Sequence, residues 1–280
     1  MTGFSTQWLA LREGADFLAR DAAVRDTVVQ RFSRSDTLTV VDLACGAGSN
    51  PRALAPFLGP RQSWRLVDHD AGLLKSARAA LMAWADAVDG EEPLALRKDG
   101  RRLTFAFERL DLNADLAGAL AGADLVSAAA FFDLVSPDWI EVFCAELARR
   151  RLPLYAVLTY DGRESWTPPH AADAAMLEAF LRHQARDKGF GPAAGPRAGA
   201  TLQAALERHG FDVQVGASPW RLGAVDAELI AALCEVAAEA VAQTGLVDAA
   251  VIADWRAARR EASGCEIGHV DIFASPPGGG

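Results

Sequence analysis

The stretch Thr39-Val-Val-Asp-Leu-Ala-Cys-Gly-Ala-Gly-Ser-Asn50 decides the fold, and the rest of the chain is arranged around it. An apolar run, Leu38 to Leu43, ends in a glycine-rich turn, and a helix-compatible segment follows from Pro51 to Leu58. A short apolar run closed by glycines is typical of a buried parallel strand that leads into a helix. Because the backbone N–H groups of the turn meet the positive end of that helix, the stretch predicts a site for an anionic or carboxylate-bearing ligand.

Further apolar segments alternate with helix-compatible ones along the chain. Parallel strands are expected at Trp64–Asp68, Thr104–Leu110, Asp124–Asp133 and Leu154–Tyr160, and two later strands at Phe211–Gly216 and His269–Ala274. Asp70 is expected to cap a helix whose apolar stripe runs from Leu74 to Val88, and Ser136 to cap another that starts at Pro137. This alternation predicts an α/β fold with a doubly wound sheet.

The glycine turn, followed by acidic residues at the ends of the next two strands, resembles the class I S-adenosylmethionine (SAM) dependent methyltransferases. The loop of that family reads (D/E)-x-x-x-G-x-G, which Asp42 to Gly48 match, and the resemblance extends over about Leu38 to Asp161. A dinucleotide fingerprint needs a third glycine where this chain has Pro51. The resemblance implies a Rossmann-like, mostly parallel sheet of seven strands in the order 3-2-1-4-5-7-6, with the last strand antiparallel.

The resemblance also implies SAM as cofactor and S-adenosylhomocysteine as product. Asp68 would accept hydrogen bonds from the ribose hydroxyls, and Asp111 would accept one from the adenine amine, beside the backbone of Leu112. Arg12 is expected to meet the SAM carboxylate, which a guanidinium matches with two hydrogen bonds. The other residues expected to contact the cofactor are Asp42, Gly46, Gly48, Asn50, His69 and Ala128.

The acceptor side is less defined by sequence. Asp133 and Tyr160, at the ends of the fourth and fifth predicted strands, are the candidate catalytic residues, because the family presents groups to the methyl and the acceptor there. The candidate substrate-binding residues are Asp161, His170, His183 and Arg221. The transferred methyl is already activated on a sulfonium, so the protein chiefly aligns the reactants for in-line displacement, and a general base is optional.

Three regions are expected along the chain. Residues 1–36 have helical periodicity and predict a helical cap over the cofactor edge of the sheet. Residues 37–280 form the methyltransferase domain, in which residues 163–200 interrupt the strand–helix alternation and predict a substrate lid after the fifth strand. Pro276 to Gly280 is expected to be a disordered tail.

Composition limits the partners. The net charge is −9 and the basic residues are dispersed among acids, which disfavours nucleic acid and favours a small-molecule acceptor. No membrane span or signal peptide is expected. The four cysteines have no metal-ligand spacing, so we expect no metal site and a cytoplasmic location with reduced thiols. A homodimer is left open.

The predicted function is methyl transfer from SAM to an oxygen or nitrogen nucleophile of a small molecule. Two alternatives stay open from the sequence. One is a non-catalytic SAM-binding or scaffold protein with a methyltransferase fold. The other is an NAD-dependent oxidoreductase that uses the glycine turn for a nicotinamide cofactor.

Overall fold

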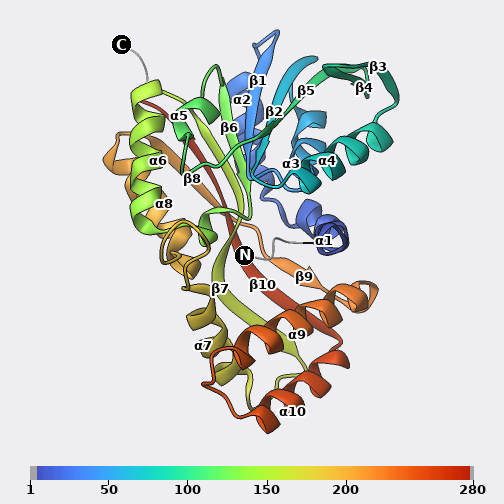
Figure 1. Cartoon of the computed structure of the whole chain (residues 1–280), viewed down its shortest axis with the longest axis vertical. Helices are drawn as coiled ribbons and strands as arrows, with labels where there is room; N and C mark the ends of the chain where they lie inside the picture. The colour runs from blue at the N-terminus through green and yellow to red at the C-terminus, as the bar shows by residue number, and fades with distance from the viewer. Residues whose placement is uncertain (1–4, 278–280) are drawn as a thin grey trace.

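The computed structural model describes residues 5–277, whose centre is a sheet of ten strands in the order β3-β4-β5-β2-β1-β6-β7-β10-β8, with β9 paired to β10 (Figure 1). The seven strands that match the prediction are β1 (Leu38–Leu43), β2 (Arg61–Asp68), β5 (Arg101–Arg109), β6 (Leu125–Ala129), β7 (Leu154–Thr167), β8 (Asp212–Ala217) and β10 (Gly264–Ser275). Their order is the predicted 3-2-1-4-5-7-6, and β10 runs antiparallel to both neighbours. The predicted fold class is confirmed.

Three strands were not predicted: β3 (Ala87–Glu91), β4 (Leu94–Lys98) and β9 (Trp220–Leu222). β3 and β4 form an antiparallel hairpin that extends the edge of the sheet beyond β5. Val88 lies in this hairpin, so its assignment to the stripe of the preceding helix is wrong: α4 (Ala71–Trp84) ends before it. Leu94 and Leu96 are buried on alternate positions against β5, a period of two that short turns on both sides obscured.

Helices cover both faces of the sheet. The buried residues of α2 (Ala22–Phe32) and α4 join one apolar cluster with Val40, and those of α6 (Pro137–Arg150) and α8 (Ala198–Arg208) join another with Val41. Consecutive residues of β1 therefore face opposite layers, as in a doubly wound fold. The predicted caps are present: the Asp70 carboxylate accepts from two backbone N–H groups of α4, and the Ser136 hydroxyl accepts from one of α6.

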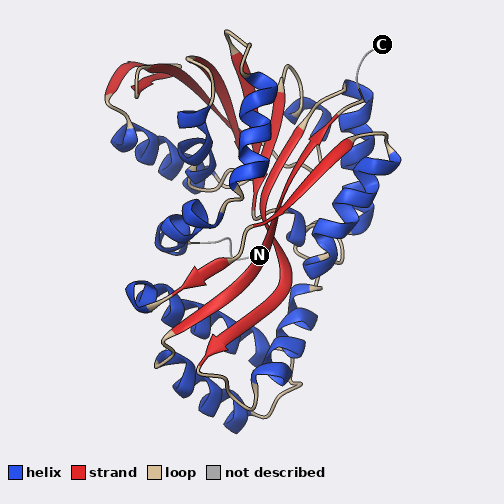
Figure 2. Cartoon of the chain, turned by 180° about the vertical axis from the view of Figure 1, so that it is seen from behind, coloured by secondary structure: helices blue, strands red, loops and turns tan. Residues whose placement is uncertain are grey.

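A second lobe lies beyond the carboxyl end of the sheet (Figures 1 and 2). β7 continues to Thr167 instead of ending at Tyr160, and it stays paired there with β10. Helices α7 (Asp173–Gln184), α9 (Ala227–Ala242) and α10 (Ala249–Arg260) pack on this extension around a third apolar cluster. The segment 163–200, expected to form a lid, thus supplies the end of β7 and α7 to a lobe that the C-terminal helices complete.

The N-terminal segment lies between the two lobes. Helix α1 (Thr6–Ala19) places Trp8, Leu11 and Ala15 against the apolar cluster of the second lobe, while α2 packs on the sheet. Residues 1–4 of the expected cap and residues 278–280 of the expected tail lie outside the described residues. The short helices are α3 (Ser49–Leu54) and α5 (Leu116–Ala119), with 3-10 turns η1 (Ala55–Phe57), η2 (Phe132–Leu134), η3 (Gly195–Arg197) and η4 (Ala224–Asp226).

None of the helices within residues 5–277 combines the length and the apolar character needed to cross a membrane. Each of the four cysteines is buried and carries a free thiol. Three of them, Cys144, Cys234 and Cys265, have a pKa raised to about 11 or 12 by burial, so these thiols stay protonated at neutral pH.

The bend in β7 where it leaves the sheet depends on one buried acid. Leu158 has a positive φ of 57°, and its N–H donates to Asp271 of β10 at 2.8 Å. The second oxygen of Asp271 accepts the N–H of Asp21, the cap of α2, at 2.8 Å. One carboxylate therefore joins the bend in β7, the bulge in β10 and the start of α2.

We expect Asp271→Ala to lower the free energy of unfolding by about 2–4 kcal/mol, because two buried backbone N–H groups lose their acceptor. Asp271→Asn keeps one acceptor oxygen and should lose less. Asp212→Ala, which removes an exposed acid from the adjacent β8, is the control and should cost about 0.5 kcal/mol or less. Urea denaturation measures all three, and an Asp271→Ala loss no larger than that of the control would contradict this role.

Candidate functional site

The glycine turn stands where the carboxyl ends of β1, β2 and β6 meet, and its backbone requires glycine. Gly46 and Gly48 have φ values of 54° and 71°, in the left-handed region. A Cβ on Gly48 would lie 3.0 Å from the Cβ of Ala77 in α4, so this glycine also allows close packing of the helix. At Gly46 the neighbour is the side chain of Leu9, 3.3 Å from the Cβ position, which shows that α1 lies over the turn.

A buried polar network supports the turn from below. The Asn50 amide donates to Asp42 at 2.6 Å and to the Ser127 hydroxyl at 2.5 Å, and its oxygen accepts from Arg20 at 2.7 Å. Burial raises the pKa of Asp42 to about 7, and the hydrogen bond from Asn50 opposes this shift. Asp42 of β1 and Asn50 of α3 thus lie together as expected. Their network also includes Ser127 of β6 and Arg20 at the end of α1.

Arg20 is a member of this network that the sequence had not singled out as a site residue. It is the C-cap residue that follows α1, and its Nε and Nη2 are buried without a hydrogen-bond partner. A buried guanidinium with two unused donors is costly unless an acceptor reaches it. The sequence signal was only a basic residue at a helix end, which is usually exposed.

Asp68 ends β2 and holds the glycine turn from the side. Its Oδ2 accepts the N–H of Gly46 at 2.9 Å, and its Oδ1 accepts the N–H of Asp70 at 3.0 Å. The side chain is buried, whereas the neighbouring His69 ring is exposed with its Nδ1 3.3 Å from Oδ1 of Asp68. The turn and the acid at the end of the second strand are therefore one structural unit.

The other residues assigned to the cofactor lie on the adjacent strand ends. β5 pairs with β2 so that Arg109 is opposite Asp68, and Asp111 follows two residues later, exposed at the surface. Leu112 is buried, and Ala128 is buried in β6 opposite Leu43 of β1. The structure brings these positions to the same edge of the sheet as the glycine turn.

A second polar group lies where the two lobes meet. Arg12 of α1 pairs with Asp16 at 3.0 Å, and its guanidinium lies 4.8 Å from the ring centre of Trp220. Its charge acts on Asp133 and on His269. Burial raises the pKa of Asp133 to about 6, although Arg12 and Lys188 oppose the shift, and Oδ1 of Asp133 is buried without a partner.

His269 of β10 completes this second group and was not a predicted site residue. Burial and the nearby Arg12 lower its pKa to about 3, and its Nδ1 is buried without a partner. Its ring lies 5.1 Å from the Trp220 ring and 6.1 Å from the Tyr160 ring. At neutral pH it is an uncharged imidazole.

Tyr160 is buried beside this group, and its hydroxyl donates to Glu164 at 2.6 Å. Burial and the nearby acids Glu164, Asp161 and Asp133 raise the pKa of Tyr160 well above its ordinary value. The Asp161 carboxylate accepts from the backbone N–H and from the guanidinium of Arg163. A Cβ on Gly268 would collide with this carboxylate.

Three predicted substrate residues have partners in the second lobe instead. The His170 ring lies 3.2 Å from Asp254 of α10, and His183 lies 3.1 Å from Gln243 at the end of α9. Arg221 is mostly exposed on β9, where it pairs with Glu266. The structure does not bring these side chains to the strand ends, and their assignment stays a prediction.

Two cavities, each of about 280 Å³, are outlined by residues away from the glycine turn. One lies inside the second lobe and is lined by residues of β7 and its helices. The other lies between the α1–α2 junction and β9, and both Arg20 and Arg221 line it. Within the described part of the chain, His, Cys, Asp and Glu side chains form no group of three or more suited to a metal ion.

Solved structures share this fold at low sequence identity. The cyclopropane-fatty-acyl-phospholipid synthase-like protein of Lactobacillus casei ATCC 334 aligns over 97% of this chain and 94% of its own, at 14% identity and a TM-score of 0.52. The cyclopropane synthase MmaA2 of Mycobacterium tuberculosis aligns over the same shares, at 10% identity and a TM-score of 0.52. Scans of family models and of curated proteins find no match. The structural likeness establishes the fold alone.

Arg12→Gln should raise the pKa of both Asp133 and His269. The positive charge of Arg12 favours the carboxylate of Asp133 and disfavours the imidazolium of His269, so its removal shifts both values upward. NMR titration of labelled aspartate and histidine side chains measures the two midpoints. Arg182→Gln on the exposed side of α7 is the control and should change neither value. Unchanged values, or shifts in opposite directions, would exclude the placement of Arg12 beside both groups.

Proposed function

We propose that this chain binds SAM at the carboxyl ends of β1, β2 and β5 and transfers its methyl group to a small-molecule nucleophile. The observation that carries the proposal is that the glycine turn, Asp68 and Asp111 lie on three adjacent strand ends of a methyltransferase-type sheet. In open α/β sheets, ligands bind in this position, outside the carboxyl ends of the strands.

The proposed contacts follow the order of the strand ends. Gly46 and Gly48 let the methionine part of SAM approach the backbone. Asp68 accepts hydrogen bonds from the ribose hydroxyls in addition to the one from the Gly46 N–H. His69 packs its exposed ring on the adenine. Asp111 accepts a hydrogen bond from the exocyclic amine of adenine, beside Leu112.

Two arginines are candidates to bind the SAM carboxylate. Arg12 is already paired with Asp16 and stacked on Trp220, whereas Arg20 has two buried nitrogens without an acceptor. The unsatisfied donors of Arg20 favour it as the carboxylate ligand, with Asn50 holding its third nitrogen in place. Arg12 then faces the junction of the lobes, where Asp133 and His269 lie.

Bound SAM supplies an activated sulfonium methyl, and the protein has to align an acceptor and exclude water. Asp133, with its pKa near 6 and one unpartnered oxygen, holds or deprotonates an acceptor amine or hydroxyl. Tyr160 keeps its proton and positions the acceptor. The segment 163–200 covers the acceptor, and Asp161, His170, His183 and Arg221 remain candidate acceptor contacts.

A cofactor at Gly46 must share space with α1. Because Leu9 lies over the turn at 3.3 Å from the Cβ position of Gly46, binding is expected to shift the first turns of α1. This helix is thus a movable cover of the cofactor edge, which agrees with the sequence-based expectation of a helical cap.

The remaining features of the proposal concern partners. The net charge of −9 and the dispersed basic residues favour a small-molecule acceptor over nucleic acid or a membrane surface. A cytoplasmic location and a homodimer stay proposals. A non-catalytic SAM-binding protein and an NAD-dependent oxidoreductase are the alternatives that the experiments below separate.

S-adenosylhomocysteine should bind with micromolar affinity in a calorimetric titration, and Asp68→Asn should weaken binding about tenfold or more. The loss follows from the removal of charge-assisted hydrogen bonds, each worth about 1.5–3 kcal/mol. Asp26→Asn, an exposed acid on α2, should bind as the wild type does. Thermal unfolding of both variants checks that the turn remains folded.

Transfer itself is tested by incubating the protein with methyl-labelled SAM and a pool of small metabolites. A labelled small molecule supports the enzyme. If S-adenosylhomocysteine binds but no acceptor gains label, the non-catalytic alternative is favoured. If NADH fluorescence increases on mixing while S-adenosylhomocysteine does not bind, the proposal is wrong.

A further inference from the structure

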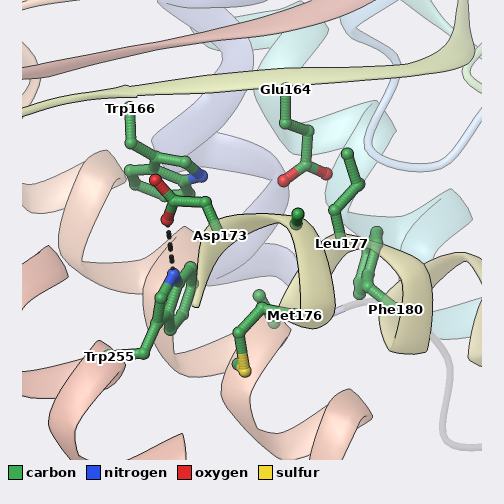
Figure 3. A pocket seen from close by; sticks show the side chains of 9 residues that line it. Glu164, Trp166, Asp173, Met176, Leu177, Phe180 and Trp255 are labelled. Carbon is green, nitrogen blue, oxygen red and sulfur yellow. Dashed lines mark hydrogen bonds between the residues drawn. The ribbon is translucent and has the colours of Figure 1, made fainter. Parts of the chain in front are cut away.

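The cavity inside the second lobe lies between the extension of β7 and helices α7, α9 and α10, and it holds about 280 Å³ (Figure 3). The side chains of Glu164 and Trp166 point from β7 into the cavity, as Figure 3 shows, and Trp255 of α10 lies on the opposite side. The complete lining consists of Glu164, Trp166, Asp173, Ala174, Met176, Leu177, Phe180, Ala237 and Trp255. Its lining, mostly apolar and aromatic with two acids, is that of a small-molecule site, and its volume is just below the usual range for one.

Aromatic rings form much of the wall. The rings of Trp166 and Trp255 meet edge to face with centres 5.6 Å apart, and Phe180 lies across the cavity beside Leu177. Met176 adds a polarizable thioether. The Arg259 guanidinium already lies 5.5 Å from the ring centre of Trp166 and 5.8 Å from that of Trp255. Aromatic faces attract cations through the ring quadrupole and also pack against an apolar body, so the Phe180 ring is the face that remains for a ligand cation.

The two acids of the cavity differ in their partners. Asp173 is bound to Arg259 at 2.8 Å, to the Trp255 indole N–H at 2.7 Å and to the His170 N–H at 2.8 Å, so its charge is compensated. Glu164 accepts from the Tyr160 hydroxyl, the side chain of Trp166 also acts on it as a donor, and no basic side chain within the described residues forms an ion pair with it. The cavity therefore has one carboxyl group without a basic partner.

We propose that this cavity binds an organic ammonium cation with an apolar body, with the ammonium group between the Glu164 carboxylate and the Phe180 ring and the apolar body against the indoles. A carboxylate next to a phenyl face favours a protonated or alkylated amine, since both attractions act on the same charge. An anionic ligand is disfavoured because it would face the Glu164 carboxylate. This inference goes beyond the proposed function, and no step of it requires SAM.

The raised pKa of Glu164 agrees with this assignment. Burial raises it, hydrogen bonds from Tyr160 and Trp166 oppose the shift, and Asp173 adds to it. An acid that is hard to ionise without a counter-ion is stabilised in its charged form when a cation arrives. The Tyr160 hydroxyl also connects the cavity to the strand ends, because its ring lies beside His269 at the junction of the lobes.

The test compares two probes of the same shape, phenyltrimethylammonium and the uncharged tert-butylbenzene, by calorimetric titration of the full-length protein without cofactor. We expect the cation to bind about tenfold or more tightly than the neutral probe, as a desolvated cation–π contact predicts. Glu164→Gln keeps the shape and the acceptor for Tyr160 but removes the charge. It should abolish the preference and leave the binding of tert-butylbenzene unchanged.

Glu266→Gln is the matched control. Glu266 lies on the adjacent strand opposite Ser165, so its side chain faces away from the cavity, and it pairs with Arg221 on the surface. This variant should keep the full preference for the cation. Equal affinity of the two probes for the wild type would overturn the inference, and so would a preference that survives in Glu164→Gln.

A second variant guards against a folding defect. Phe180→Leu removes one ring but keeps an apolar wall, and it should weaken the cation more than the neutral probe. S-adenosylhomocysteine titrated into the same samples reports the proposed function separately. A cation preference without binding of S-adenosylhomocysteine supports the cavity assignment and contradicts only the proposed cofactor.

Discussion

Two buried carboxylates hold the glycine turn, and the rest of the candidate site depends on them. Asp68 fixes the Gly46 N–H from the end of β2, while Asp42 is bound through Asn50 to Ser127 and Arg20. Burying these charges is costly, as the pKa of Asp42 near 7 indicates, so the network is stable only when its hydrogen bonds are made together. It therefore ties α1 to the sheet and sets which edge of the sheet can receive a ligand.

The second lobe is not a separate appendage, because it is built on the same two strands as the sheet. β7 and β10 run through both lobes. Where β7 bends between the lobes, Asp271 accepts the N–H groups of Leu158 and Asp21 and fixes the bend. A lobe attached by two paired strands moves less freely than one attached by a flexible loop. The cavity around Glu164 is thus held at a defined position relative to the strand ends.

The sequence predicted what depends on local pattern. The caps at Asp70 and Ser136 follow from local turn residues, whereas the order of the seven strands was implied by the family resemblance; both are confirmed. The extension of β7 was missed because Asp161, Arg163 and Glu164 interrupt its apolar pattern outside the doubly covered sheet. The surroundings of Arg20 and Glu164 could not be predicted for another reason: the partners of a side chain depend on packing between distant segments, and neither residue has a local signature.

Tyr160 and Asp133 lie close to the same junction, yet their surroundings suit them to different tasks. The tyrosine hydroxyl donates a hydrogen bond to Glu164 and has a raised pKa, so it stays protonated at neutral pH and does not act as a base. Asp133 has an unpartnered oxygen and a pKa near 6, so it can accept a proton at neutral pH. If a nucleophile loses a proton at this junction, the geometry favours Asp133 as its acceptor, because the Tyr160 hydroxyl is already bound to Glu164.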